Sequence, residues 1–167
     1  STGPLAVLVH GFPDTAHTWD RVMPAVAALG FRVVAPFTRG YWPSEAKGPY
    51  DSDTLGADIV GLIEALGETS AIVLGHDWGA SAAYAAAGSR PDRVRMLITL
   101  AIPHPKSLKP TPRTIWNVRH FFTLSRKNAA AKIRKNNYRY IDELWRRWSP
   151  GWKNLPKSET AAVKESF

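Results

Sequence analysis

The chain has 167 residues, enough for about one domain, and its 44% hydrophobic and 22% charged residues are typical of a globular protein. It contains no cysteine, which excludes a disulfide framework, a thiolate metal site and a cysteine nucleophile, and no apolar run approaches the roughly 20 residues of a membrane span. The net charge of +8 divides into −3 over residues 1–103 (7 Lys and Arg, 10 Asp and Glu) and +11 over residues 104–167 (15 and 4), which predicts two modules.

The first module, residues 1–103, alternates expected strands and helices. The apolar run over residues 5–9 fits a strand buried on both faces, and apolar residues at helical spacing from Trp19 to Ala27 predict a helix that Gly30 ends. The other expected elements are strands over 31–35, 71–74 and 94–102, helices over 55–66 and 80–87, and a loop over 39–53. This order predicts an α/β fold with a doubly wound parallel sheet, in which sites form at the carboxyl ends of the strands.

The second module, residues 104–167, has no convincing strand. Residues 114–124 and 129–148 read as helices rich in aromatic and basic side chains. We expect a helical subdomain that begins near Pro103-His104-Pro105.

The pentapeptide Gly75-His76-Asp77-Trp78-Gly79 follows an expected strand and precedes an expected helix. Two glycines around one reactive residue suit a sharp turn that pushes the central side chain into a pocket. A carboxylate at that position is ionised at neutral pH and can displace a leaving group from saturated carbon, which makes Asp77 a candidate nucleophile. Water would then hydrolyse the ester, and the N–H groups of Trp78 and Phe12 would stabilise the oxyanion.

The motifs His10-Gly11-Phe12-Pro13 and Gly75-His76-Asp77-Trp78-Gly79, in this order, resemble the α/β-hydrolase superfamily. The resemblance is closest to its aspartate-nucleophile branch, the epoxide hydrolases and haloalkane dehalogenases. It implies a partial α/β-hydrolase core over residues 1–103 and the start of a helical cap over 104–167. Phe12 favours the epoxide hydrolases, because dehalogenases usually have a polar residue there.

The same resemblance suggests substrate contacts. In dehalogenases the indole of Trp78 would hold the departing halide. In epoxide hydrolases two cap tyrosines donate to the epoxide oxygen, and Tyr138 and Tyr140 lie in the corresponding region. His104 is a further candidate, either in the pocket wall or in a surface turn. No cofactor and no metal ion are expected.

The chain also departs from the family pattern. The family's catalytic acid and histidine come after the nucleophile, and neither His104 nor His120 matches that histidine. We therefore expect a fragment of a longer hydrolase, inert or limited to a single turnover alone. Thr38 stands where many relatives have an acid, and Trp42 where many have glycine.

Structural roles remain open for several of these residues. Asp77 could be a turn residue, and Tyr138 and Tyr140 could serve packing. Other residues have more ordinary expectations: structural roles for His10 and His76, a core position for Trp19, an ion pair for Arg39 and a cap for Asp14.

The basic module offers a different function. Its interleaved basic and aromatic residues could bind nucleic acid or a membrane surface if the charges shared one continuous face. We expect instead a solvated lid, a small-molecule substrate such as an epoxide or alkyl halide, and neither nucleic acid nor membrane as partner. The cysteine-free sequence is compatible with a cytoplasmic location.

Overall fold

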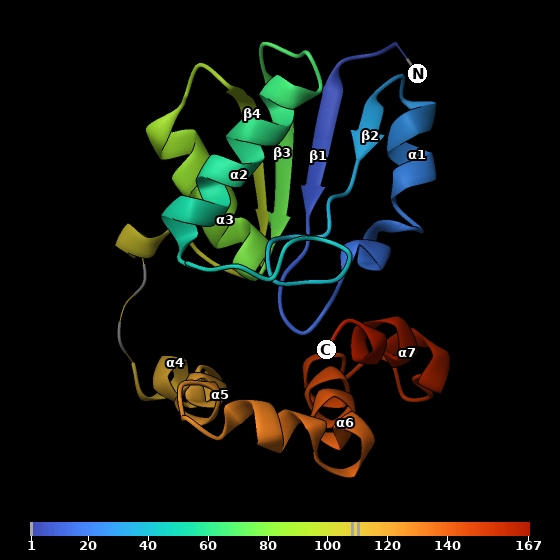
Figure 1. Ribbon diagram of the computed structural model, residues 1–167, viewed down its shortest axis with the longest axis vertical. Coiled ribbons are helices and arrows are strands. Elements are labelled where there is room, and N and C mark those ends of the chain that lie inside the picture. Colours follow the sequence, from blue (N-terminus) through green and yellow to red (C-terminus); the bar gives the residue numbers. More distant parts are fainter. Residues whose placement is uncertain (1, 108, 110) are drawn as a thin grey trace. The chain divides into compact units, whose positions relative to one another are not determined.

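The computed structural model describes residues 2–107, 109 and 111–167. These residues form two compact units (Figure 1). The sheet unit runs to Pro103 and includes Ser166, and the helical unit runs from His104 to Glu165 and includes Phe167.

The sheet unit contains one sheet of four parallel strands in the order β2-β1-β3-β4. The strands are β1 (Leu5–Val9), β2 (Arg32–Val34), β3 (Ala71–His76) and β4 (Val94–Leu100). All five residues of β1 are buried, as expected for a central strand with both faces covered. The predicted parallel α/β fold is confirmed.

Helices cover the two faces of this sheet (Figure 1). On one face, α2 (Ser52–Ala65) and α3 (Trp78–Ser89) pack against Leu5, Val7 and Val9 of β1. On the other face, α1 (Met23–Ala28) and Trp19 pack against Ala6 and Leu8. Trp19 is only 5% exposed, which confirms its predicted core position.

The segment before α1 differs from the sequence prediction. Trp19 ends a short 3-10 helix, η1 (Ala16–Trp19), and α1 begins at Met23 with a proline in its first turn. The cap of η1 is Thr15, whose hydroxyl accepts a hydrogen bond from His17 N–H. Asp14, the expected cap, instead accepts one from Thr15 N–H at 2.8 Å. Trp19 is thus in the core without belonging to α1.

The other differences concern element ends. The strand expected over 71–74 continues to His76, and the helix expected from Ala80 starts at Trp78, so that one residue separates β3 from α3. The last strand ends at Leu100, before Ala101 with a φ of 70°. The loop expected over 39–53 ends earlier than expected, because α2 begins at Ser52 and Asp51 caps it.

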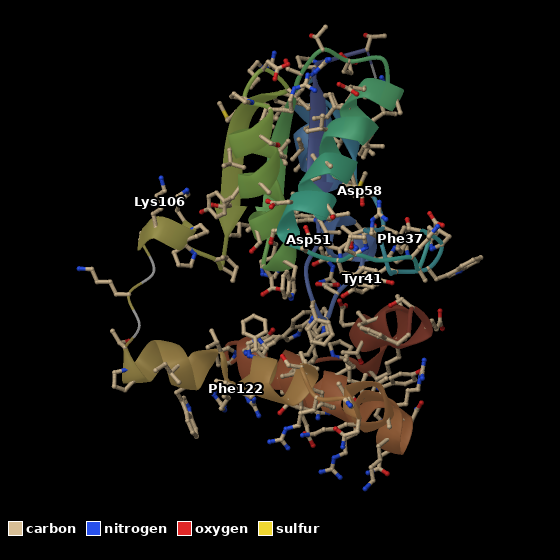
Figure 2. The ribbon with its side chains drawn as sticks, turned by 60° about the vertical axis from the view of Figure 1, so that its left-hand side comes forward. Phe37, Tyr41, Asp51, Asp58, Lys106 and Phe122 are labelled. Atoms are coloured by element: carbon tan, nitrogen blue, oxygen red, sulfur yellow. The ribbon has the colours of Figure 1, made fainter. Side chains whose placement is uncertain are left out.

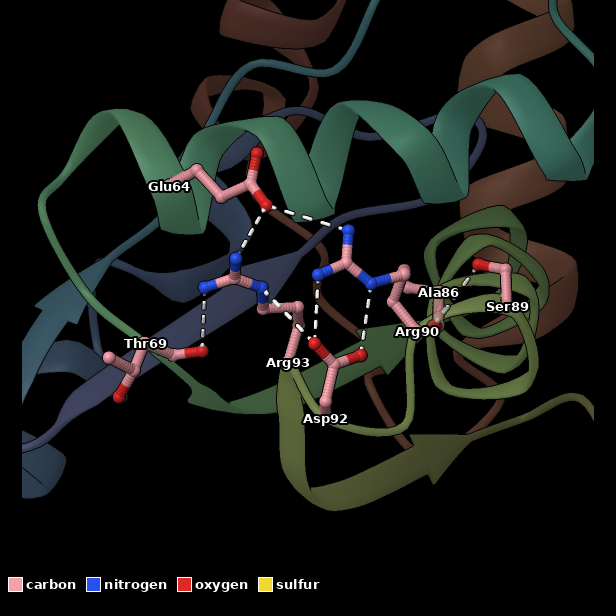
Figure 3. Close-up of polar contacts among 7 residues, drawn as sticks. All are labelled: Glu64, Thr69, Ala86, Ser89, Arg90, Asp92 and Arg93. Carbon is pink, nitrogen blue, oxygen red and sulfur yellow. Dashed lines mark hydrogen bonds and ion pairs between the residues drawn. The ribbon is translucent and has the colours of Figure 1, made fainter.

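An ion-pair network joins the end of α2 to the turn between α3 and β4 (Figure 3). Glu64 lies 3.0 Å from Arg93 and 3.6 Å from Arg90. Both arginines also pair with Asp92, and Arg93 donates to the Thr69 carbonyl. The network connects three segments at the edge of the sheet opposite the strands' carboxyl ends.

The helical unit contains η2 (Pro105–Ser107), α4 (Pro112–Asn117), α5 (Arg119–Leu124), α6 (Ala129–Trp148) and α7 (Lys157–Glu165). The single helix expected over 114–124 is divided between α4 and α5, and α7 was not expected. Ile141, Leu144 and Val163 are fully buried and attach α7 to α6. In the part of the chain that the structure describes, no helix has the length and apolarity needed to cross a bilayer.

Candidate active site

The turn between β3 and α3 places Asp77 at its apex. Asp77 has φ 53° and ψ −119°, a backbone conformation that L residues rarely adopt. A Cβ on Gly79 would lie 2.6 Å from the His10 carbonyl oxygen, and a Cβ on Gly75 would meet the Gly79 backbone. The close approach of the chain therefore requires glycine at both positions, as the sequence pattern suggested.

The carboxylate of Asp77 meets the loop that follows β1. Phe12 N–H donates a hydrogen bond to Asp77 Oδ1 at 3.0 Å. Gly11 allows this approach, because a Cβ there would lie 2.5 Å from Asp77 Cβ. Among the described residues this is the only hydrogen bond that the carboxylate accepts, and the side chain does not cap α3. The other carboxylate oxygen, Oδ2, accepts no hydrogen bond from the described residues and can therefore act as a nucleophile.

His10 holds the peptide group that makes this contact. Thr38 N–H donates to His10 Nε2 at 3.1 Å, and the Thr38 hydroxyl lies at the same distance. Because Nε2 accepts, the proton of the neutral ring is on Nδ1, which donates to the Gly11 carbonyl at 3.1 Å. That carbonyl and Phe12 N–H belong to one planar peptide unit. His10 therefore fixes the direction of the N–H that reaches Asp77.

Burial keeps His10 in this form. The imidazole is 1% exposed, and desolvation, with a smaller contribution from nearby His76, lowers its pKa to about 4. The ring of Tyr41 packs edge-on against it, with centroids 4.7 Å apart. His10 is thus neutral at physiological pH and has both ring nitrogens engaged, in line with its predicted structural role.

The loop after β2 is anchored by Arg39. Its guanidinium forms a bidentate pair with Asp58 of α2, at 2.7 and 2.6 Å, and donates to the Lys47 carbonyl at 3.0 Å. The predicted ion pair of Arg39 is confirmed, and Figure 2 shows Asp58 on α2 near Phe37 and Tyr41 of this loop. The pair fixes one wall of the site.

A cavity of about 300 Å³ lies between this loop and the two helices. Its lining includes Trp78 and Gly79 from the start of α3, Leu55 and Asp58 from α2, and Phe37 and Thr38 from the loop. The Trp78 side chain is 39% exposed. The lining of this cavity is mainly apolar, which suits a small organic ligand, but it includes neither Asp77 nor Phe12, so the cavity lies beside the candidate nucleophile and is not lined by it.

The other sequence candidates lie in the helical unit. His104 is exposed in a turn, where its Nδ1 accepts a hydrogen bond from Lys106 N–H. Tyr138 is half-buried at a break in α6, where it has a φ of 58°, and its ring lies 6.4 Å from that of Phe167. Tyr140 is half-buried beneath the ammonium group of Lys132. Substrate contact by these three residues stays a prediction.

Sequence reasoning missed the role of Thr38. The residue was noted because it replaces a family acid, and that departure was the available signal. What the sequence did not indicate is that Thr38 reaches back 28 positions to His10 and selects its tautomer.

Comparison with known proteins agrees with this geometry. The model of the alpha/beta hydrolase fold family matches residues 4–160. An epoxide hydrolase from Caballeronia sordidicola is 46% identical over 104 residues, which are 60% of this chain and 32% of that protein. Epoxide hydrolase B from Mycobacterium tuberculosis is 40% identical over 104 residues, 60% of this chain and 29% of that protein.

A solved structure extends the likeness to the whole chain. The crystal structure of a Bacillus megaterium epoxide hydrolase in complex with an inhibitor has a TM-score of 0.88 and 26% identity, covering 100% of this chain and 61% of that one. The sequence matches span about a third of the length of the two curated relatives.

Proposed function

The chain belongs to the α/β-hydrolase fold family, and on that basis we propose that it carries the nucleophile of an epoxide hydrolase. The observation that carries this proposal is the hydrogen bond from Phe12 N–H to Asp77 Oδ1, at the apex of a strained strand-to-helix turn. Residues 1–103 would form the hydrolase core and residues 104–167 the start of a cap.

The cysteine-free sequence supports a cytoplasmic location.

The two carboxylate oxygens would have different roles. Oδ2 attacks an epoxide carbon, the carbon–oxygen bond of the ring breaks, and the epoxide oxygen takes a proton from an acid, for which Tyr138 and Tyr140 are the candidates. Oδ1 becomes the carbonyl oxygen of the resulting ester and already lies against an amide donor. When water attacks the ester carbon, Oδ1 takes the negative charge, and the N–H groups of Phe12 and Trp78 stabilise it.

Hydrolysis of the ester also needs a general base, worth about 10²–10⁴-fold in rate. His10 cannot supply it, because both ring nitrogens are engaged and its pKa is lowered to about 4. His17 is occupied with Asp20 at 3.0 Å. We propose that the base and its acid partner lie outside these 167 residues and that this chain alone stops at the ester.

The test is alkylation of the 167-residue chain by styrene oxide, followed by peptide mass spectrometry. We expect one hydroxyalkyl adduct on Asp77, which is absent in Asp77→Asn and retained in Asp20→Asn, where an exposed carboxylate is removed. An adduct that persists in Asp77→Asn, or no adduct on Asp77 with either styrene oxide or 1-bromobutane, would overturn the nucleophile assignment.

A haloalkane dehalogenase-type reaction is the second candidate. It is favoured by the partly exposed indole of Trp78 beside the cavity, because an indole N–H can hold a departing halide. The same experiment with 1-bromobutane separates the two. Alkylation of Asp77 by the bromide, with none by the epoxide, would assign the site to the second reaction.

A further inference from the structure

The helical unit begins with a long basic segment, and the proposed reaction does not use the charges of that segment. Residues 104–141, which we call the basic–aromatic segment, contain ten Lys and Arg and no Asp or Glu. A charge of this size and sign repels itself and attracts anionic partners.

The chain itself does little to neutralise this charge. In the sheet unit four arginines form ion pairs with carboxylates: Arg32, Arg39, Arg90 and Arg93. In the basic–aromatic segment, by contrast, five exposed cations have no carboxylate partner among the described residues: Lys106, Arg126, Lys127, Lys132 and Lys135. Figure 2 shows nitrogen-tipped side chains along α6, the helix that carries Lys132 and Lys135. These cations are available to an external anion.

The same segment exposes large apolar side chains. Trp116 and Phe122 are each 65% exposed and Ile115 is 53% exposed. The Arg119 guanidinium lies over the Trp116 ring at 4.2 Å, and Phe122 follows Arg119 by three residues on α5, so these two share a helix face. One cation, Arg119, therefore lies among the exposed aromatic side chains.

In place of the sequence-based expectation of no membrane partner, we propose that the basic–aromatic segment adsorbs to anionic phospholipid bilayers. Lys and Arg would contact lipid phosphates, while Ile115, Trp116 and Phe122 would enter the headgroup–acyl boundary, where tryptophan is favoured. An aliphatic side chain such as Ile115 gains nothing from base stacking, which favours a bilayer over a nucleic acid. Cytoplasmic leaflets carry the required anionic lipids. This inference does not depend on the proposed reaction.

Vesicle co-sedimentation of the full 167-residue chain tests the proposal. Vesicles of phosphatidylcholine alone are compared with equal parts of phosphatidylcholine and phosphatidylglycerol, at low and high ionic strength. We expect sedimentation with the mixed vesicles at low ionic strength, little with phosphatidylcholine, and release by salt. Tryptophan fluorescence should shift to shorter wavelength on binding.

Two variants separate charge from apolar insertion. Arg126→Gln with Lys127→Gln should weaken binding about tenfold or more, since each surface cation contributes substantially to attraction by anionic lipid. Phe122→Ser should weaken it several-fold and reduce the fluorescence shift. The matched controls lie in the sheet unit: Lys47→Gln with Arg95→Gln removes the same charge, and Trp42→Ala removes an exposed indole. Both should bind like the parent chain, and circular dichroism confirms folding of every variant.

Each result decides the proposal. Binding that falls equally in the control variants would mean unspecific attraction by net charge and would overturn it. Unchanged binding by Phe122→Ser would overturn insertion at the interface. Retention of a single-stranded DNA in a gel shift, without sedimentation by mixed vesicles, would assign the segment to nucleic acid instead.

Discussion

Phe12 and Asp77 are 65 residues apart, yet the main-chain N–H of one lies 3.0 Å from the carboxylate of the other. The contact uses a backbone donor, so the side chain at position 12 does not provide it. What it requires is a close approach of two loops at the carboxyl edge of the sheet. Substitution of the residues that permit this approach therefore tests the site as directly as substitution of Asp77.

Gly11→Ala should disrupt this approach. The new Cβ would lie 2.5 Å from Asp77 Cβ and 2.6 Å from the His76 carbonyl oxygen, so one loop has to move. We expect a loss of about 1–3 kcal/mol in the free energy of unfolding, as for other overpacked sites. The rate of Asp77 alkylation by styrene oxide, measured by mass spectrometry, should also fall. Wild-type alkylation in a folded Gly11→Ala protein would show that the contact is dispensable for this step.

Gly61→Ala supplies the matched control. Gly61 lies inside α2, and a Cβ there meets nothing within 4 Å. Alanine in a helix interior is favoured over glycine by about 0.5–1 kcal/mol. We expect a correspondingly higher free energy of unfolding by urea and an unchanged alkylation rate. A destabilised Gly61→Ala protein would contradict the packing described for α2.

His10 should make folding sensitive to moderate acid. Its pKa is lowered to about 4 in the folded chain by burial, against about 6.5 when unfolded. Between these values the unfolded state binds a proton that the folded state does not, so stability falls as the pH decreases from about 6.5 to about 4. The full loss from this group is about 3 kcal/mol. Urea unfolding between pH 7 and pH 5 should show a steeper decline in the parent than in His10→Gln.

Nuclear magnetic resonance of the parent chain measures the pKa and the tautomer of His10 directly, without a variant. The His10 ring should titrate with a midpoint near 4 and show, at neutral pH, a proton on Nδ1 and none on Nε2. A midpoint near 6.5 would contradict the burial of the ring, and a proton on Nε2 would contradict the hydrogen bonds from Thr38 and to Gly11.

The parts of this structure that sequence could predict are those governed by local chemistry. A continuous apolar run predicts β1, and the glycine-framed Asp77 predicts a sharp turn, because both depend on neighbouring residues. Trp19 shows where prediction from apolar spacing fails. Its apolar spacing fits a continuous helix, but Pro24 and Thr15 define two separate helical starts. The break near Val118 and the helix α7 likewise depend on tertiary packing that periodicity does not reveal.

Some features of the candidate site could likewise be predicted from the sequence, and others could not. Asp77 and the amide of Phe12 could be predicted because each follows a strand, and parallel strands end at one edge of the sheet. The contact between Thr38 and His10 could not, because it depends on the path of the loop after β2 and on which ring nitrogen faces it. Tautomer selection is a property of the assembled site.

Glu64→Gln tests whether the ion-pair network contributes to the stability of the sheet unit. Glu64 is the carboxylate that connects α2 to Arg90 and Arg93, so the substitution leaves both arginines with Asp92 as their remaining carboxylate partner in the described part of the chain. We expect a lower melting temperature in dilute buffer and a smaller difference at high ionic strength, because partly exposed pairs are screened. Glu45→Gln removes an exposed carboxylate that has no ion pair among the described residues, and it should change the melting temperature less. If the effect of Glu64→Gln were the same at every salt concentration, the loss would come from packing of the side chain and not from its charge.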